Sequence, residues 1–162
     1  MVDQVVHPLK PIYDEESKVL ILGSFPSVIS RKERFYYANK TNRFWKVLGQ
    51  IYDEKISNKE EFCHKHHIAL WDVIESCTIQ GSSDASITNI KVNDIASLIS
   101  KTKIQVIFTT GSKASSIYEK YMNNLEIKHI ALPSTSSANA KMKLDDLIEK
   151  YKVIKEFTNE ED

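Results

Sequence analysis

The chain has 162 residues, 41% of them hydrophobic, and carries equal numbers of basic and acidic residues. This length and composition fit a single domain over residues 1–162 with a core of its own, and they exclude a largely disordered chain. No apolar run approaches the ~20 residues that span a bilayer, and no secretory leader is visible, so we expect a cytoplasmic protein without a membrane anchor. Cys63 and Cys77 fit neither a disulfide framework nor a zinc ribbon, and we expect both to be reduced.

The charges are distributed unevenly along the chain. Between Arg31 and Lys46 six residues are basic and one, Glu33, is acidic, whereas residues 156–162 form an acidic tail. A net charge of zero argues against a general nucleic-acid binder, but a local positive face can still attract phosphate. A solvated basic segment explains the same charges equally well.

Strands and helices alternate along the chain. In chain order the pattern predicts an extended lead-in through residue 16, a strand at 19–22, helices at 42–51 and 59–67, a strand at 68–74, a helix at 92–99, a strand at 104–109, a helix at 112–121, a strand ending at 132 and a helix at 144–157. The helical spacing of Phe44 and Leu48 supports the first helix and places Asn42 near its N-cap. We therefore expect an α/β fold, a three-layer α/β/α domain with a four-stranded parallel sheet.

Two polar loops follow strands of the predicted sheet. The first loop is Gly23–Ser27, and the second is Leu132–Asn139. Because ligands bind at the carboxyl ends of parallel strands, both loops are expected to face one site. The segment Phe35–Trp45 combines aromatic, amide and basic side chains, which suits a flat, uncharged ring next to a phosphate chain. The sequence therefore points to chemistry on a nucleic-acid base.

Three positions near these loops allow more than one interpretation. Tyr36 and Tyr37 are adjacent in a loop, where we expect that both cannot point inward and that at least one stacks on a base. Asp72 ends an apolar strand, so its carboxylate is either a ligand contact or a buried anchor for loop amides. Asp84 lies in a Gly-Ser-Ser-Asp turn, and we expect it to cap that turn rather than to act in catalysis.

Neither a metal nor a nucleotide cofactor is indicated. Cys63 and His67 would share one face of a helix, but two ligands do not make a metal site. The first loop lacks the glycines of a P-loop and of a dinucleotide-binding fingerprint. We therefore predict no metal and no cofactor.

Together these segments resemble the uracil-DNA glycosylase superfamily, which carries a Gly-x-x-Pro type motif after its first strand and a Pro-Ser motif after its last. Within it, the hypoxanthine-DNA (deoxyinosine) glycosylase branch is the most similar. The resemblance covers nearly the whole chain and rests on Gly23–Ser27, the Tyr36–Tyr37 pair, Asn42–Trp45, Trp71–Val73, Gly81–Asp84 and Leu132–Ser136. The mismatch-specific uracil glycosylase branch shares Asn-Arg-Phe-Trp and is the nearest rival.

The resemblance implies a monomeric, monofunctional enzyme that acts on double-stranded DNA containing a deaminated base, with hypoxanthine favoured, and associates with the nucleoid when bound. The damaged nucleotide is flipped into the pocket, its N-glycosidic bond is hydrolysed, and an abasic site remains for base excision repair. The implied roles are water positioning by Asn42; base binding by Ser24, Phe25, Tyr37 and Asp72; and DNA-phosphate binding by Ser27, Arg43, Ser134, Thr135, Ser136 and Lys141.

The chain departs from the superfamily pattern in two places. The uracil branches mostly place Asn or Asp in the first motif to orient the attacking water; Phe25 stands there in this chain, which passes the role to Asn42. Residues 39–41 replace a His-Pro pair, and the second loop lacks the bulky leucine of many relatives. Three alternatives stay open: a mismatch-specific uracil-DNA glycosylase, a non-catalytic binder of damaged DNA that has no need of Asn42, and a nucleoside or nucleotide hydrolase that gains nothing from basic loops.

Overall fold

A four-stranded parallel sheet forms the centre of the protein, which is described over residues 3–158 in a computed structural model. Its strands are β2 (Val19–Gly23), β3 (Ile68–Asp72), β6 (Val106–Thr110) and β7 (Lys128–Leu132), in the order β3-β2-β6-β7. Every neighbouring pair is parallel, so the carboxyl ends of all four strands lie at one edge. The predicted sheet is confirmed.

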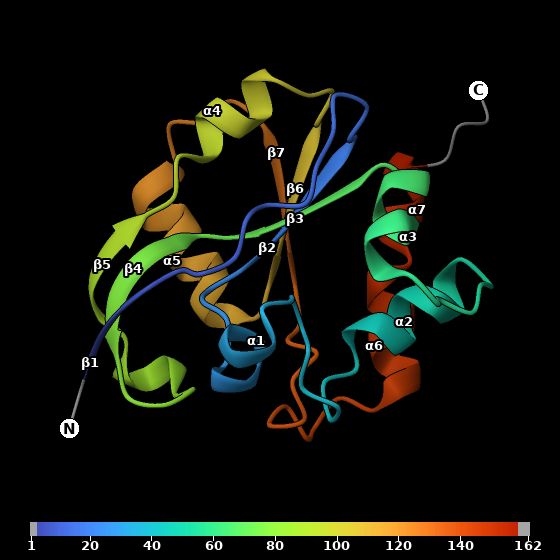
Figure 1. The fold of residues 1–162 in the computed structure, drawn as a ribbon. Coiled ribbons are helices and arrows are strands. Elements are labelled where there is room, and N and C mark those ends of the chain that lie inside the picture. The colour runs from blue at the N-terminus through green and yellow to red at the C-terminus, as the bar shows by residue number, and fades with distance from the viewer. Residues whose placement is uncertain (1–2, 159–162) are drawn as a thin grey trace.

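Helices cover both faces of this sheet (Figure 1). They are α1 (Val28–Glu33), α2 (Phe44–Ile51), α3 (Lys59–Lys65), α4 (Ile95–Ser100), α5 (Ser112–Met122), α6 (Leu144–Tyr151) and α7 (Val153–Thr158). Successive residues of a strand point to opposite faces. Val19 and Ile21 accordingly join the core beneath α2, α3, α6 and α7, whereas Leu20 and Leu22 pack with α4 and α5. The predicted three-layer arrangement is confirmed.

A second, antiparallel sheet was not anticipated from the sequence. It consists of β1 (Asp3–Val6), β4 (Ile74–Ile79) and β5 (Thr88–Val92), with β4 in the middle. The predicted strand at 68–74 is divided, because Val73 ends the parallel pairing with a hydrogen bond to the Gly23 carbonyl and the chain then enters the second sheet. This sheet packs beside α4 and α5 (Figure 1).

Several predicted helix boundaries shift for local reasons. The predicted helix at 92–99 begins later, at Ile95, because Thr88–Val92 is paired as β5 and the Asp94 side chain caps the helix. The predicted helix at 144–157 is divided at Lys152 into α6 and α7. The sequence pattern predicts no helix at Val28–Glu33, where the structure has α1. Of the predicted acidic tail, residues 156–158 belong to α7, and residues 159–162 lie outside the described residues.

Three further findings concern the described residues. None of their helices has both the length and the apolar character needed to cross a membrane. No group of three or more His, Cys, Asp or Glu side chains within residues 3–158 could hold a metal ion. Cys63 and Cys77 are both buried and free.

Candidate active site

One pocket of about 210 Å³ lies at the carboxyl ends of the central strands. It is lined by the first loop, by parts of residues 36–42, by Asp72 and Thr110 at strand ends, and by the second loop. Of the residues proposed from the sequence, the pocket brings together Ser24, Phe25, Ser27, Tyr37, Asn42, Asp72, Ser134, Thr135 and Ser136. Arg43 and Lys141 are not part of its lining. Segments distant in the sequence thus share one cavity, as predicted.

The floor of the pocket is built around Gly23, the last residue of β2. A methyl group in place of the Gly23 hydrogen would lie 2.5 Å from the Asp72 carboxylate and 3.4 Å from the Tyr37 hydroxyl. Thr110 Oγ1 would lie 3.6 Å from the same point. Gly23 therefore leaves room for three polar groups from three segments to meet.

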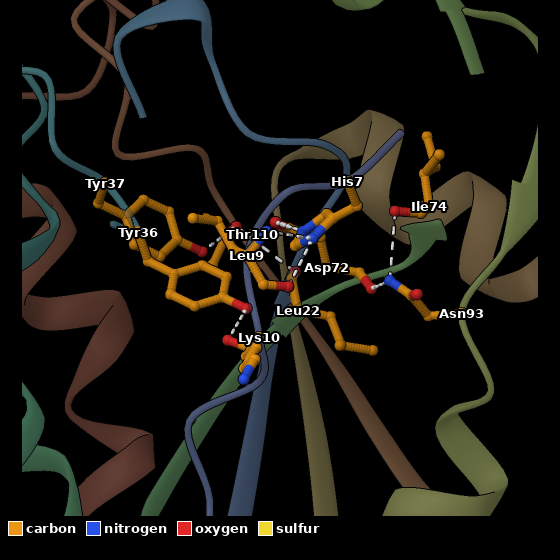
Figure 2. Close-up of polar contacts among 10 residues, drawn as sticks. All are labelled: His7, Leu9, Lys10, Leu22, Tyr36, Tyr37, Asp72, Ile74, Asn93 and Thr110. Atoms are coloured by element: carbon orange, nitrogen blue, oxygen red, sulfur yellow. Dashed lines mark hydrogen bonds and ion pairs between the residues drawn. The ribbon is translucent and has the colours of Figure 1, made fainter. Parts of the chain in front are cut away.

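Asp72 is anchored by a histidine from the N-terminal segment (Figure 2). His7 Nε2 lies 2.7 Å from Asp72 Oδ2, and the two side chains are only 2% and 6% exposed. Asp72 Oδ1 has no hydrogen-bond partner among residues 3–158 and lies over Gly23. The partner of the Asp72 carboxylate is thus the His7 ring and not the loop amides expected from the sequence, and the contact of its other oxygen with a ligand stays a prediction. Sequence reasoning missed His7, because one histidine in an extended lead-in carries no pattern.

Both adjacent tyrosines point inward, contrary to the expectation from the sequence (Figure 2). Tyr37 has a φ of 53°, a left-handed conformation that turns its ring to the same side as Tyr36. The Tyr36 hydroxyl donates to the Lys10 carbonyl at 2.8 Å, and the Tyr37 hydroxyl lies 3.1 Å from Thr110 Oγ1. The ring of Tyr37 stacks on Phe44 at 3.8 Å, so a base has only its opposite face available.

The Tyr37 phenol is held in its neutral form. Burial raises its pKa well above the ordinary value, and the nearby Asp72 charge raises it further, while the hydrogen bond with Thr110 acts in the opposite direction. A neutral phenol can donate a hydrogen bond. Thr110 Oγ1 lies within hydrogen-bond distance of both the Tyr37 hydroxyl and the Leu22 carbonyl, so the single Tyr37 proton is free for a ligand when Thr110 donates to Tyr37. In that arrangement the pocket floor holds an acceptor, Asp72 Oδ1, beside a donor, the Tyr37 hydroxyl.

Asn42 is fixed by two hydrogen bonds to its amide oxygen. Oδ1 accepts from the Phe44 backbone N–H at 2.9 Å and from the Thr135 hydroxyl at 2.8 Å. Since a backbone N–H can only donate, these bonds assign the oxygen of the amide. The amide nitrogen has no partner among the described residues, which leaves Nδ2 as the group that can bind a water or a substrate atom.

Arg43 holds the second loop in place. Its guanidinium donates to four backbone carbonyls of that loop and the residues just after it, those of Thr135, Ser136, Asn139 and Met142. A planar fork of donors suits this arrangement, which ties the start of α2 to the loop. The predicted contact between Arg43 and a DNA phosphate stays a prediction.

The other proposed phosphate ligands lie on the two loops, except Lys141, which follows the second loop. Ser27 caps α1 by accepting from the Ser30 N–H, and Ser134 accepts from the Ser136 N–H. Ser136 in turn accepts from Ala138, and Lys141 is exposed beyond the pocket. These serines stiffen the loops that line the pocket; their contacts with phosphate stay predictions.

Asp84 is a second pocket carboxylate, and the capping role expected for it is wrong. Its Oδ1 accepts from the Ser24 hydroxyl at 3.1 Å, and no side-chain hydrogen bond caps the short 3₁₀ helix that it begins. Burial raises the pKa of Asp84, and the bond from Ser24 opposes that shift. The turn is also held by Arg31, which donates to the Gly81 carbonyl.

A family model for the Uracil DNA glycosylase superfamily matches residues 10–159 of the chain. The matched range includes both polar loops, the four strands of the central sheet and all residues that line the pocket. The chain belongs to this superfamily, and is thereby a DNA glycosylase by family.

Two relatives and one solved structure refine the comparison. A hypoxanthine DNA glycosylase of Methanosarcina acetivorans is 34% identical over 79% of this chain and 84% of its own length. A hypoxanthine DNA glycosylase of Methanosarcina barkeri is 30% identical over 80% of this chain and 85% of its own. The solution NMR structure of a Methanosarcina acetivorans protein, provisionally assigned as a uracil DNA glycosylase, superposes with a TM-score of 0.75 at 28% identity, covering 90% of this chain and 96% of that one.

Proposed function

We propose that this protein releases hypoxanthine from DNA by hydrolysing the N-glycosidic bond of deoxyinosine, and leaves an abasic site. Two relatives that are 34% and 30% identical to it over the aligned residues carry the name hypoxanthine DNA glycosylase. The observation that carries the proposal is the acceptor–donor pair of Asp72 Oδ1 and the Tyr37 hydroxyl above Gly23.

This pair matches the edge that deamination creates on a base. Hypoxanthine presents a ring N1–H beside the O6 carbonyl, so the N–H donates to Asp72 and the carbonyl accepts from Tyr37. Adenine presents the reverse, a bare N1 beside an amino group, and would leave a buried carboxylate facing a lone pair. Because a site built to hydrogen-bond one edge rejects its mismatch strongly, the floor favours hypoxanthine over adenine and uracil over cytosine.

The base reaches this floor only after it leaves the DNA stack. Both polar loops line the pocket, and Lys32, Arg34 and Lys40 of the basic segment are exposed to solvent. Phosphates flanking the flipped nucleotide are placed against the second loop, where Ser134 and Ser136 offer hydroxyls. These contacts position DNA without reading its sequence.

Asn42 holds the attacking water. Departure of the base builds positive charge on the sugar, which makes the sugar reactive toward a neutral water. Correct positioning of the water therefore matters more than its deprotonation. The Asn42 amide nitrogen donates to the water oxygen while Phe44 and Thr135 fix the amide plane. No lysine lines the pocket among residues 3–158, so no amine is placed to form a covalent intermediate, and simple hydrolysis follows.

Uracil release is the second candidate, because uracil carries the same N–H beside a carbonyl. The Asp72–Tyr37 pair accepts either base, and the names of the two relatives favour hypoxanthine. A set of duplexes that carry one deoxyinosine, deoxyuridine, thymine mismatch or deoxyadenosine therefore tests the proposal, with strand cleavage by alkali as the readout of abasic sites. Hypoxanthine release exceeding uracil release is expected; release of none of the bases contradicts the enzyme function.

The Asn42→Ala variant separates the enzyme from a non-catalytic binder of damaged DNA. We expect base release to fall by at least about 100-fold, since loss of positioning at the reacting atoms has effects of that size, while binding to the deoxyinosine duplex is retained. Asn58→Ala is the matched control, because Asn58 likewise accepts a backbone N–H through its side chain, at the start of α3, and lies outside the pocket. Unchanged release by Asn42→Ala would remove Asn42 from the mechanism.

A further inference from the structure

The ring of His7 lies among Asp72, Leu9 and Tyr36 (Figure 2), and contacts from several segments fix its position. Its backbone N–H donates to the Glu75 carbonyl at 2.7 Å. Its ring meets Phe25 edge-on with 5.8 Å between the ring centres and lies 6.2 Å from the ring of Tyr36. A side chain that is 2% exposed and bonded to the Asp72 carboxylate therefore has one orientation available.

The second ring nitrogen of His7 faces both polar groups of one residue. Nδ1 lies 3.0 Å from the Leu9 carbonyl oxygen and 3.2 Å from the Leu9 nitrogen. A neutral ring accepts from the Leu9 N–H, and a charged ring donates to the Leu9 carbonyl. An ionised Asp72 can only accept, so Nε2 must carry the proton and donate to Asp72 Oδ2 in both of these forms.

We propose that His7 is the residue that sets base specificity, by holding Asp72 as a pure acceptor toward the pocket. With Oδ2 occupied by His7, the proton-free Oδ1 accepts a ring N–H and repels a bare ring nitrogen. This inference rests on the proposed function. It adds the residue that gives the pocket its preference for hypoxanthine over adenine. His7 is a positioning residue, since it acts through Asp72.

Removal of the His7 donor is expected to reverse which base the pocket floor prefers. A buried carboxyl group without a partner is more stable as the neutral acid. A protonated Asp72 donates to the pocket and so favours the bare N1 of adenine over the N1–H of hypoxanthine. The discrimination between the two bases, and not only the overall rate, should therefore depend on His7.

The test compares His7→Phe with His7→Gln under single-turnover conditions, using matched duplexes with deoxyinosine or deoxyadenosine. Phe keeps the ring contacts and removes the donor, whereas the Gln amide nitrogen can replace Nε2. We expect His7→Phe to lower hypoxanthine release on the order of 10- to 100-fold and to lower the hypoxanthine-to-adenine ratio by at least the same factor. His7→Gln should restore most of both. His64→Gln is the control, because His64 also pairs with an aspartate, Asp14, and neither residue lines the pocket.

Asp72→Asn tests the same claim with His7 in place. His7 holds the amide oxygen, which turns the amide nitrogen, a donor, toward the base; hypoxanthine release should again fall on the order of 10- to 100-fold. The inference is overturned if His7→Phe keeps the wild-type ratio or if Asp72→Asn releases hypoxanthine at the wild-type rate. A wild-type protein that releases no base contradicts the proposed function instead, so the two failures are distinguishable.

Discussion

Adding one methyl group at Gly23 should damage the pocket floor more than the fold. In Gly23→Ala the new Cβ would lie 2.5 Å from Asp72 Oδ1, whereas ordinary contact begins at 3.4 Å, so the carboxylate has to retreat by about 0.9 Å. Asp72 is 4% exposed and bonded to His7, so this movement also disturbs the His7 bond. Misplacement near 1 Å in a catalytic constellation costs on the order of 100-fold in rate.

We therefore expect Gly23→Ala to release hypoxanthine about 100-fold more slowly while unfolding in urea with a loss of only about 1–3 kcal/mol, the usual range for overpacking. Alkali cleavage of a deoxyinosine duplex measures the first quantity, and urea titration measures the second. Gly49→Ala is the control, since its Cβ would lie 3.0 Å from the Glu54 carbonyl, outside the pocket. A Gly23→Ala protein with wild-type release would refute the idea that this close approach forms the base-reading floor.

Two further predictions concern stability. Arg43→Lys should lose about 2–3 kcal/mol in urea unfolding and expose the second loop to proteolysis, because a lysine cannot donate to four carbonyls at once; wild-type stability and protection would show that the Arg43 bonds do not hold the loop. Burial raises the pKa of Cys63 from 9.0 to about 12. The folded state thus keeps a proton that the unfolded chain loses, so stability is full below about pH 9 and falls as pH rises toward 12, by up to about 1.4 kcal/mol per pH unit. Urea titrations across this range should show a shallower fall for Cys63→Ala, and equal slopes would count against the assignment.

The central sheet could be predicted because its strands are apolar runs separated by helical periodicity. The residues of β4, Ile74–Ile79, do not alternate regularly between apolar and polar, and the preceding apolar run from Ile68 hides the point where the chain changes sheets. That break depends on Val73 donating to Gly23, a long-range contact with no local signal. The second sheet therefore escaped prediction, although its strands have ordinary lengths.

The candidate site was predictable where residues follow strand ends, as Asp72 and the serines of both loops do. His7, which holds Asp72, and Asp84, which lines the pocket, were both missed, because each is bonded to a partner more than 50 positions away, Asp72 and Ser24 respectively. The inward position of Tyr37 depends on a left-handed backbone conformation that a tyrosine rarely adopts, and that sequence spacing does not reveal. The occupied oxygen of Asn42 likewise follows from Thr135 in the second loop.

The most direct measurement is a structure of the Asn42→Ala protein bound to a duplex that carries one deoxyinosine. The account predicts an everted hypoxanthine whose N1 lies within hydrogen-bond distance of Asp72 Oδ1 and whose O6 faces the Tyr37 hydroxyl. A base that stays stacked in the duplex, or that enters the pocket with its other edge toward Asp72, would contradict it.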